Sequence, residues 1–128
     1  MESNVEPNVN STIQGQDIEK MLSDRPLDPQ FRIAIGDRFM KAGKIKEAQQ
    51  QYERALDLDN ENVEAAVRMG DLLLSQGRVV EADRYYYQAL EYAPTNGRYI
   101  VRLAETTALK GESQLAEILY QMSTDRRA

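Results

Sequence analysis

Residues 35–58 have the sequence IGDRFMKAGKIKEAQQQYERALDL, and residues 69–92 have the sequence MGDLLLSQGRVVEADRYYYQALEY. Glycine, alanine and tyrosine recur at the same steps in both stretches, 34 residues apart, and a weaker third copy follows. A constant period of this length predicts one supersecondary unit that is repeated and buries its apolar face by stacking on its neighbours. The residues that keep the period are Gly43, Gly77 and Gly111; Ala48, Ala82 and Ala116; and Tyr52, Tyr86 and Tyr120.

Each copy contains two amphipathic segments, one on either side of its glycine. In the first copy, Asp28 is an N-cap residue, and Pro29 stands at the first helical position, where proline is favoured. That copy predicts one helix to about residue 42 and a second over about residues 44–58, with Gly43 supplying the turn. Strand signals are absent, so the sequence predicts an all-α fold with six repeat helices. The predicted repeat domain, residues 28–128, divides into repeats at about 29–62, 63–96 and 97–128.

Residues 1–27 differ from the repeats in composition, and we expect a flexible N-terminal segment there. The first 16 residues or so are rich in Asn, Ser, Gln and Glu, which is typical of disordered chains. Residues 17–23 carry Ile18, Met21 and Leu22 at helical spacing and predict a short amphipathic turn.

Composition excludes several classes of function. The 128-residue chain suits one domain, and its net charge of -5 disfavours nucleic acid and anionic lipid as partners. No apolar run reaches the ~20 residues that cross a bilayer, and the N-terminus lacks the features of a signal peptide, so we expect a cytoplasmic protein without membrane insertion. With no histidine, no cysteine and no phosphate-binding loop, the sequence predicts no enzyme, no metal site and no cofactor.

The pattern resembles the tetratricopeptide repeat, over about residues 29–128. The family combines a large residue, Leu-Gly and an aromatic residue with a later alanine, aromatic residue, alanine and proline. The second copy matches best; the first has Arg32 at a position that is usually apolar, and the third has Ala104 at the position of the glycine. The resemblance implies an antiparallel helix-pair solenoid wound as a right-handed superhelix. The matching residues of the second copy are Ala66, Met69, Gly70, Leu73, Ala82, Tyr86, Ala89 and Pro94.

The same resemblance implies a ligand-binding groove on the concave face. In this family the fifth, ninth and twelfth positions of the first helix of each repeat commonly meet a ligand. Here they form two apolar stripes beside three carboxylates, which suits a peptide or helix with apolar and basic residues. An alternative is a solvated face on which Asp71 pairs with Arg68 and Glu105 with Arg102. The groove residues are Ile33, Asp37, Met40, Val67, Asp71, Leu74, Val101, Glu105 and Ala108.

The last predicted helix has an unusual apolar face. Leu115, Ile118, Leu119 and Met122 stand where the earlier copies carry mostly charged or amide side chains. We assign packing against the preceding helix to Ala116 and Tyr120, which leaves the four apolar residues as an interface for oligomerisation or capping. A second copy of the chain, another protein, or the segment around Ile18 are the alternatives for what covers it.

These observations favour a non-catalytic adaptor or chaperone-like scaffold that binds a peptide or helix of a partner protein. The alternative is a structural assembly protein that forms a homo-oligomer through its last helix.

Overall fold

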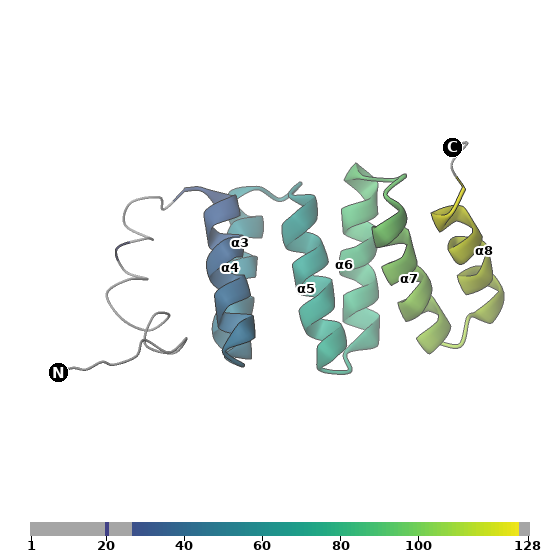
Figure 1. Cartoon of the computed structure of the whole chain (residues 1–128), viewed down its shortest axis with the longest axis horizontal. Helices are drawn as coiled ribbons and strands as arrows, with labels where there is room; N and C mark the ends of the chain where they lie inside the picture. The colour runs from purple at the N-terminus through teal and green to yellow at the C-terminus, as the bar shows by residue number, and fades with distance from the viewer. Residues whose placement is uncertain (1–19, 21–26, 126–128) are drawn as a thin grey trace. The chain divides into compact units, whose positions relative to one another are not determined.

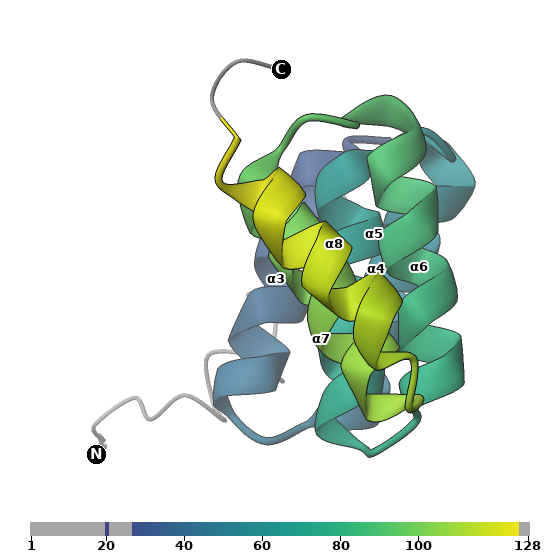
Figure 2. The same ribbon diagram turned by 90° about the vertical axis from the view of Figure 1, so that its right-hand side faces the viewer.

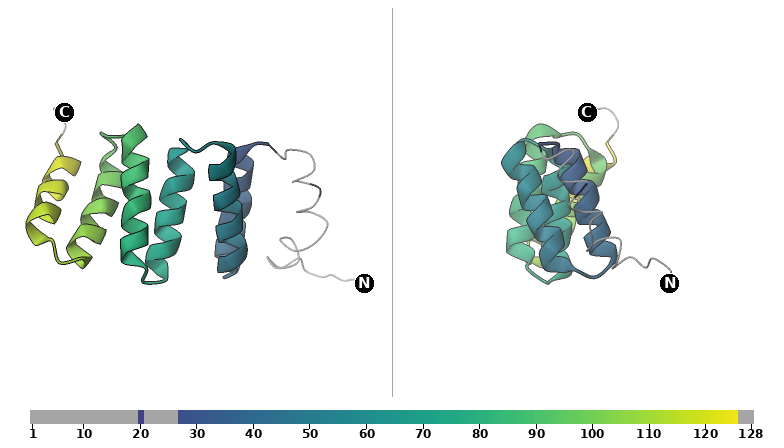
Figure 3. Two further views of the ribbon diagram at one scale, coloured as in Figure 1. Left: turned by 180° about the vertical axis from the view of Figure 1, so that it is seen from behind. Right: turned by 90° about the vertical axis from the view of Figure 1, so that its left-hand side faces the viewer.

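The computed structural model describes residue 20 and residues 27–125. Over these residues the fold is all-α, with no strand and with six helices in sequential antiparallel pairs, which confirms the predicted class (Figures 1 and 3). The amphipathic turn predicted at 17–23 lies outside the described residues, apart from Lys20. The helices are α3 (Pro29–Lys41), α4 (Ile45–Leu58), α5 (Val63–Ser75), α6 (Val79–Tyr92), α7 (Gly97–Leu109) and α8 (Ser113–Ser123).

The chain divides into two compact units. Unit 1 comprises residues up to Asn60 and contains the pair α3 and α4. Unit 2 begins at Glu61 and contains α5 to α8. Within unit 2, α6 packs against both α5 and α7, and α7 packs against α8, as Figure 2 shows from the side of α8.

The first helix of every pair begins with a side-chain cap. Asp28 accepts hydrogen bonds from the backbone N–H groups of Gln30 and Phe31, at 3.0 and 3.4 Å. Asn62 and Asn96 cap α5 and α7 in the same way. These side chains satisfy backbone donors that have no partner inside the helix, which defines where each pair starts.

A left-handed glycine ends the first helix of every pair. Gly43 and Gly77 both have φ +76°, and Gly111 has φ +88°, a region that glycine enters without steric cost. The backbone N–H of the residue after each glycine donates a hydrogen bond to the carbonyl five positions earlier, as Lys44 does to the Phe39 carbonyl at 2.9 Å. This is a Schellman motif, and it lets the second helix fold back along the first.

In each of the first two helix pairs, a tyrosine of the second helix packs on a glycine of the first helix. The ring of Tyr52 lies against Gly36 of α3, and the ring of Tyr86 lies against Gly70 of α5. Both tyrosines are buried, and a β-carbon added at either glycine would clash with the ring. In these two pairs, the tyrosine ring therefore requires a glycine at the facing position, which explains why both residues recur 34 residues apart.

The third pair departs from this arrangement, and the expectation that Tyr120 packs in the core is wrong. Ala104 stands where the other pairs have glycine, so its β-carbon occupies the space that the ring would need. Tyr120 is accordingly 41% exposed. Leu119, which we expected at an interface, is buried instead and packs with Ala116 in the α7–α8 pair.

Candidate functional site

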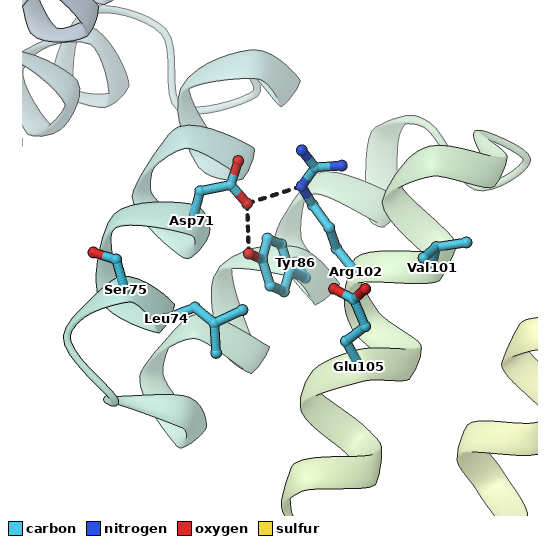
Figure 4. A pocket seen from close by; sticks show the side chains of 7 residues that line it. All are labelled: Asp71, Leu74, Ser75, Tyr86, Val101, Arg102 and Glu105. Atoms are coloured by element: carbon cyan, nitrogen blue, oxygen red, sulfur yellow. Dashed lines mark hydrogen bonds and ion pairs between the residues drawn. The ribbon is translucent and has the colours of Figure 1, made fainter. Parts of the chain in front are cut away.

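Unit 2 contains a groove of about 480 Å³ between α5 and α7 (Figure 4). It forms because α6 lies against both helices, so that the Tyr86 side chain reaches the floor between them. Four of the nine predicted groove residues meet here: Asp71, Leu74, Val101 and Glu105. The full lining is Asp71, Leu74, Ser75, Tyr86, Val101, Arg102 and Glu105.

Asp71 is the centre of a hydrogen-bonded group in this groove. Its Oδ1 accepts from the Tyr86 hydroxyl at 2.6 Å and from Arg102 Nε at 2.8 Å, so one carboxylate joins α5, α6 and α7 (Figure 4). Burial, with the hydrogen bond to Asp71 as the second cause, raises the pKa of Tyr86. The hydrogen bond to Asp71 also raises the pKa of Arg102. The charge of Asp71 is therefore compensated from within the protein.

The local ion pairs expected from helix spacing do not form. Arg68 bonds to Glu64 at 3.1 Å, and Arg102 bonds to Asp71 across the groove. Glu105 is exposed and has no hydrogen-bond partner among the described residues. Of the carboxylates that line this groove, Glu105 is thus the one left available to a ligand.

The apolar stripe is narrower than we expected. Ile33 is 2% exposed and Val67 is 1% exposed, so neither is available to a ligand, and the prediction that they line a groove is wrong. Each lies three residues before the glycine that packs on a tyrosine, Gly36 or Gly70, and therefore on the same inward side of its helix. Leu74 and Val101 remain half-buried at the groove, where Leu74 points from α5 toward α7 (Figure 4). Ala108 is exposed and does not belong to this lining.

In unit 1, α3 carries the equivalents of the unit 2 residues. Asp37 Oδ1 accepts from the Tyr52 hydroxyl at 2.5 Å, as Asp71 does from Tyr86. Met40 is half-buried on the same helix. The acid of each of the two pairs is therefore held by the tyrosine of its own pair.

Sequence reasoning missed Ser75, Tyr86 and Arg102 as groove residues. A signal for the tyrosine was present, since Asp37 and Tyr52 are 15 residues apart and so are Asp71 and Tyr86. Arg102 lies 31 residues from Asp71, and no local spacing indicates that contact.

The outer face of α8 carries three of the four predicted interface residues at its surface. Leu115, Ile118 and Met122 are exposed, whereas Leu119 is buried. A second, shallow hollow is lined by Ile118, Gln121, Met122 and Asp125.

The described part of the chain contains neither a metal-binding group nor a membrane-spanning helix. Among the residues placed by the structure, no group of His, Cys, Asp and Glu could hold a metal ion. None of the described helices is long and apolar enough to cross a membrane.

Residues 39–99 match a family model described as the tetratricopeptide repeat. The matched residues are tetratricopeptide repeats. The match covers the second helix pair, with its contact between Gly70 and Tyr86, and the turn and helix before it. Tetratricopeptide repeats are non-catalytic scaffolds that bind proteins and peptides, so the family confirms the expectation that the chain is not an enzyme.

Solved structures of tetratricopeptide-repeat proteins have the same fold. A crystal structure of MamA is 16% identical with a TM-score of 0.78, and the match covers 90% of this chain and 62% of that one. A crystal structure of YrrB, titled a TPR protein with an unusual peptide-binding site, is 20% identical with a TM-score of 0.76. That match covers 82% of this chain and 54% of the YrrB chain. The chain thus spans less than two thirds of either protein, and a comparison with curated proteins finds no significant match.

Proposed function

We propose that this tetratricopeptide-repeat protein binds a peptide or helix of a partner protein in the groove of unit 2. The observation that carries the proposal is the combination of partly exposed Leu74 and Val101 with Glu105, whose carboxylate has no hydrogen-bond partner among the described residues. The peptide-binding site named for YrrB supports the same use of the fold. A chaperone-like role, in which the groove shields a segment of a partner, is a variant of this proposal.

The groove is built before the ligand arrives. Tyr86, Asp71 and Arg102 hold one another through two hydrogen bonds, so the floor and both walls keep their geometry without a ligand. A preorganised wall loses little conformational entropy on binding. Leu74 and Val101 then supply apolar contact, and Glu105 supplies a charge that can select for a basic residue.

Repeat equivalence extends the proposal to other residues. Asp37 and Met40 of unit 1 occupy the positions that Asp71 and Leu74 have in the second repeat. Ala108 occupies the position of Leu74 in the third repeat. We propose them as further ligand contacts of their own helices, with Met40 contributing apolar surface.

Selection of peptides from a displayed random library against the full immobilised chain tests the groove. Peptides recovered with the unaltered protein are then measured against Leu74→Asp, which places a charge on the apolar wall. We expect affinity to fall at least tenfold, because the charge must lose its hydration in contact with the ligand. Val80→Asp is the matched control, since Val80 is exposed on α6 outside the groove. Equal binding by the Leu74 variant, with helical content intact, would remove the groove as the site.

A second candidate function is self-association through α8. Leu115, Ile118 and Met122 lie at positions i, i+3 and i+7, and this stripe is self-complementary when two helices pair antiparallel about a twofold axis near Ile118. An 11-residue helix is only ~16 Å long, which is too short to bury the ~800 Å² per partner of a standard stable interface. We therefore expect weak association.

Light scattering over a range of concentrations tests self-association. The average molar mass should rise with concentration for the unaltered protein and stay at the monomer value for Ile118→Glu. Val80→Glu again serves as the control for an added surface charge. A molar mass of one chain at every concentration contradicts this candidate.

A further inference from the structure

Helix α7 carries charges of both signs: Arg102 and Glu105 line the groove of unit 2, and Arg98 is exposed on the same helix. Arg98 and Arg102 lie one turn apart in its first half, and Glu105 lies almost one turn beyond Arg102. The Arg102 side chain is 35% exposed; its Nε donates to Asp71 (Figure 4), and its Nη1 donates to the Arg98 carbonyl at 3.5 Å. Arg102 can therefore still donate hydrogen bonds to a ligand, because a guanidinium carries five N–H donors.

The balance of these charges argues against a strongly basic ligand. Asp71 and Glu105 contribute two negative charges and Arg98 and Arg102 two positive ones, so the group as a whole is neutral. A ligand with several lysines would meet Glu105 and also the two arginines. Because Asp71 is already paired with Arg102, it adds little attraction for a second cation.

We propose that the groove recognises a charge-balanced segment in which an apolar residue is flanked by one acidic and one basic residue. The basic residue lies at Glu105, the acidic residue at Arg102 and Arg98, and the apolar residue at Leu74. This inference rests on the proposed peptide-binding function and names the chemistry of its ligand.

The spacing along α7 fits an extended ligand. From Arg98 to Glu105 the helix rises ~10.5 Å, since each residue adds ~1.5 Å. An extended chain places residues i, i+2 and i+4 on one face, with ~13 Å between the first and the last. Long Arg and Glu side chains cover the difference. The pattern acid, any residue, apolar residue, any residue, base therefore matches the helix.

Four capped, fluorescently labelled peptides test the inference by anisotropy against the full chain. They share the frame Ser-Gly-X-Ala-Leu-Ala-Z-Gly-Ser, with X and Z as Glu and Lys, Lys and Lys, Glu and Glu, or Gln and Gln. Each exposed ion pair adds about 2–5-fold in affinity, so the Glu and Lys peptide should bind at least a few-fold tighter than the other three. The preference should shrink as salt is raised, because screening weakens exposed pairs.

A variant of the chain assigns the basic subsite. Glu105→Gln should lower the affinity for the Glu and Lys peptide about 2–5-fold and leave the Gln and Gln peptide unchanged. Glu91→Gln is the matched control, because Glu91 is exposed on α6 outside the groove lining.

The outcomes separate the inference from the function on which it rests. Tightest binding of the Lys and Lys peptide, equal binding of all four, or an unchanged preference in Glu105→Gln each overturns the inference while the groove stands. Failure of all four peptides to bind at ~1 mM, where specific recognition of a short segment should be measurable, overturns both.

Discussion

At the scale of single residues, the contact between glycine and tyrosine decides how each helix pair closes. Tyr86 lies directly on Gly70, and Tyr52 lies on Gly36 in the same way. Where Ala104 replaces the glycine, Tyr120 is half exposed. One methyl group on the facing helix therefore distinguishes the pair with an exposed tyrosine from the two pairs with a buried one.

Gly70→Ala should destabilise the chain because the new β-carbon would overlap the ring of Tyr86. Overpacking of this kind costs about 1–3 kcal/mol in the free energy of unfolding, which urea denaturation followed by circular dichroism measures. Ala104→Gly is the control: it relieves no clash and should cost at most ~1 kcal/mol through helix propensity. Unchanged stability of Gly70→Ala would show that the ring can move without loss.

Two adjacent threonines of α7 predict opposite effects of one substitution. Thr107 is fully buried and its hydroxyl has no hydrogen-bond partner within the described part of the chain, whereas the Thr106 hydroxyl donates to Asp83 Oδ1 at 2.6 Å. Thr107→Val should raise the free energy of unfolding by about 1 kcal/mol, and Thr106→Val should lower it by about 1–3 kcal/mol. Denaturant titration of the two variants side by side checks the sign. A loss of stability in Thr107→Val would contradict the conclusion that the Thr107 hydroxyl makes no hydrogen bond.

At the scale of helices, a buried polar group joins α6 to α7. Asp83 is 4% exposed and accepts from Thr106 and, at 2.8 Å, from Lys110 Nζ. One repeat earlier, the equivalent positions hold Gln49, Leu72 and Gln76, so this group belongs to one helix junction. A buried carboxylate is tolerated only with such partners, and it therefore specifies the register of α7 on α6.

Lys110→Met should destabilise the chain by about 2–3 kcal/mol, because it leaves the buried Asp83 carboxylate without its cation. Thermal and urea unfolding measure the loss. Lys46→Met, at an exposed position of α4, is the control and should be nearly neutral. Equal stability of the two variants would mean that Lys110 contributes no net stabilisation.

The same lysine and Tyr86 predict how stability depends on alkaline pH. The hydrogen bond to Asp83 raises the pKa of Lys110 above 10.5, and burial raises the pKa of Tyr86 above 10.0. The unfolded chain loses these protons near the usual values while the folded chain keeps them. The free energy of unfolding should thus be flat up to about pH 9.5 and fall as the pH rises beyond 10. Tyr86→Phe should give a shallower fall; an identical slope would contradict the raised pKa.

At the scale of the whole molecule, the sequence predicts the repeated elements well and the side-chain contacts between them less well. The 34-residue period places each glycine turn and each helix pair, because these depend on contacts within one repeat. The partner of Asp71 could not be predicted, since Arg102 comes from the following repeat. The exposure of Tyr120 follows from the replacement of the packed glycine by Ala104. The sequence shows this replacement, but its effect depends on how closely the tyrosine ring approaches the facing helix.

The number of buried residues also differs among the helices of unit 2, and this difference predicts which helix unfolds locally most readily. Seven residues of α5 are buried, including Leu72 and Leu73, whereas α8 buries only Ala116 and Leu119. Helices with few buried contacts open at lower free energy than the core. We expect amides of α8 to exchange with solvent at least ~30-fold faster than those of α5, which corresponds to ~2 kcal/mol.

Hydrogen exchange measured by mass spectrometry at several protein concentrations checks this prediction and also reports on the α8 surface. Protection of α8 that rises with concentration would mean that a second copy covers Leu115, Ile118 and Met122. Weak protection at every concentration would leave α8 as a free end of unit 2 and speak against self-association. Protection equal to that of α5 in dilute solution would contradict the prediction, because two buried residues cannot hold a helix as firmly as seven.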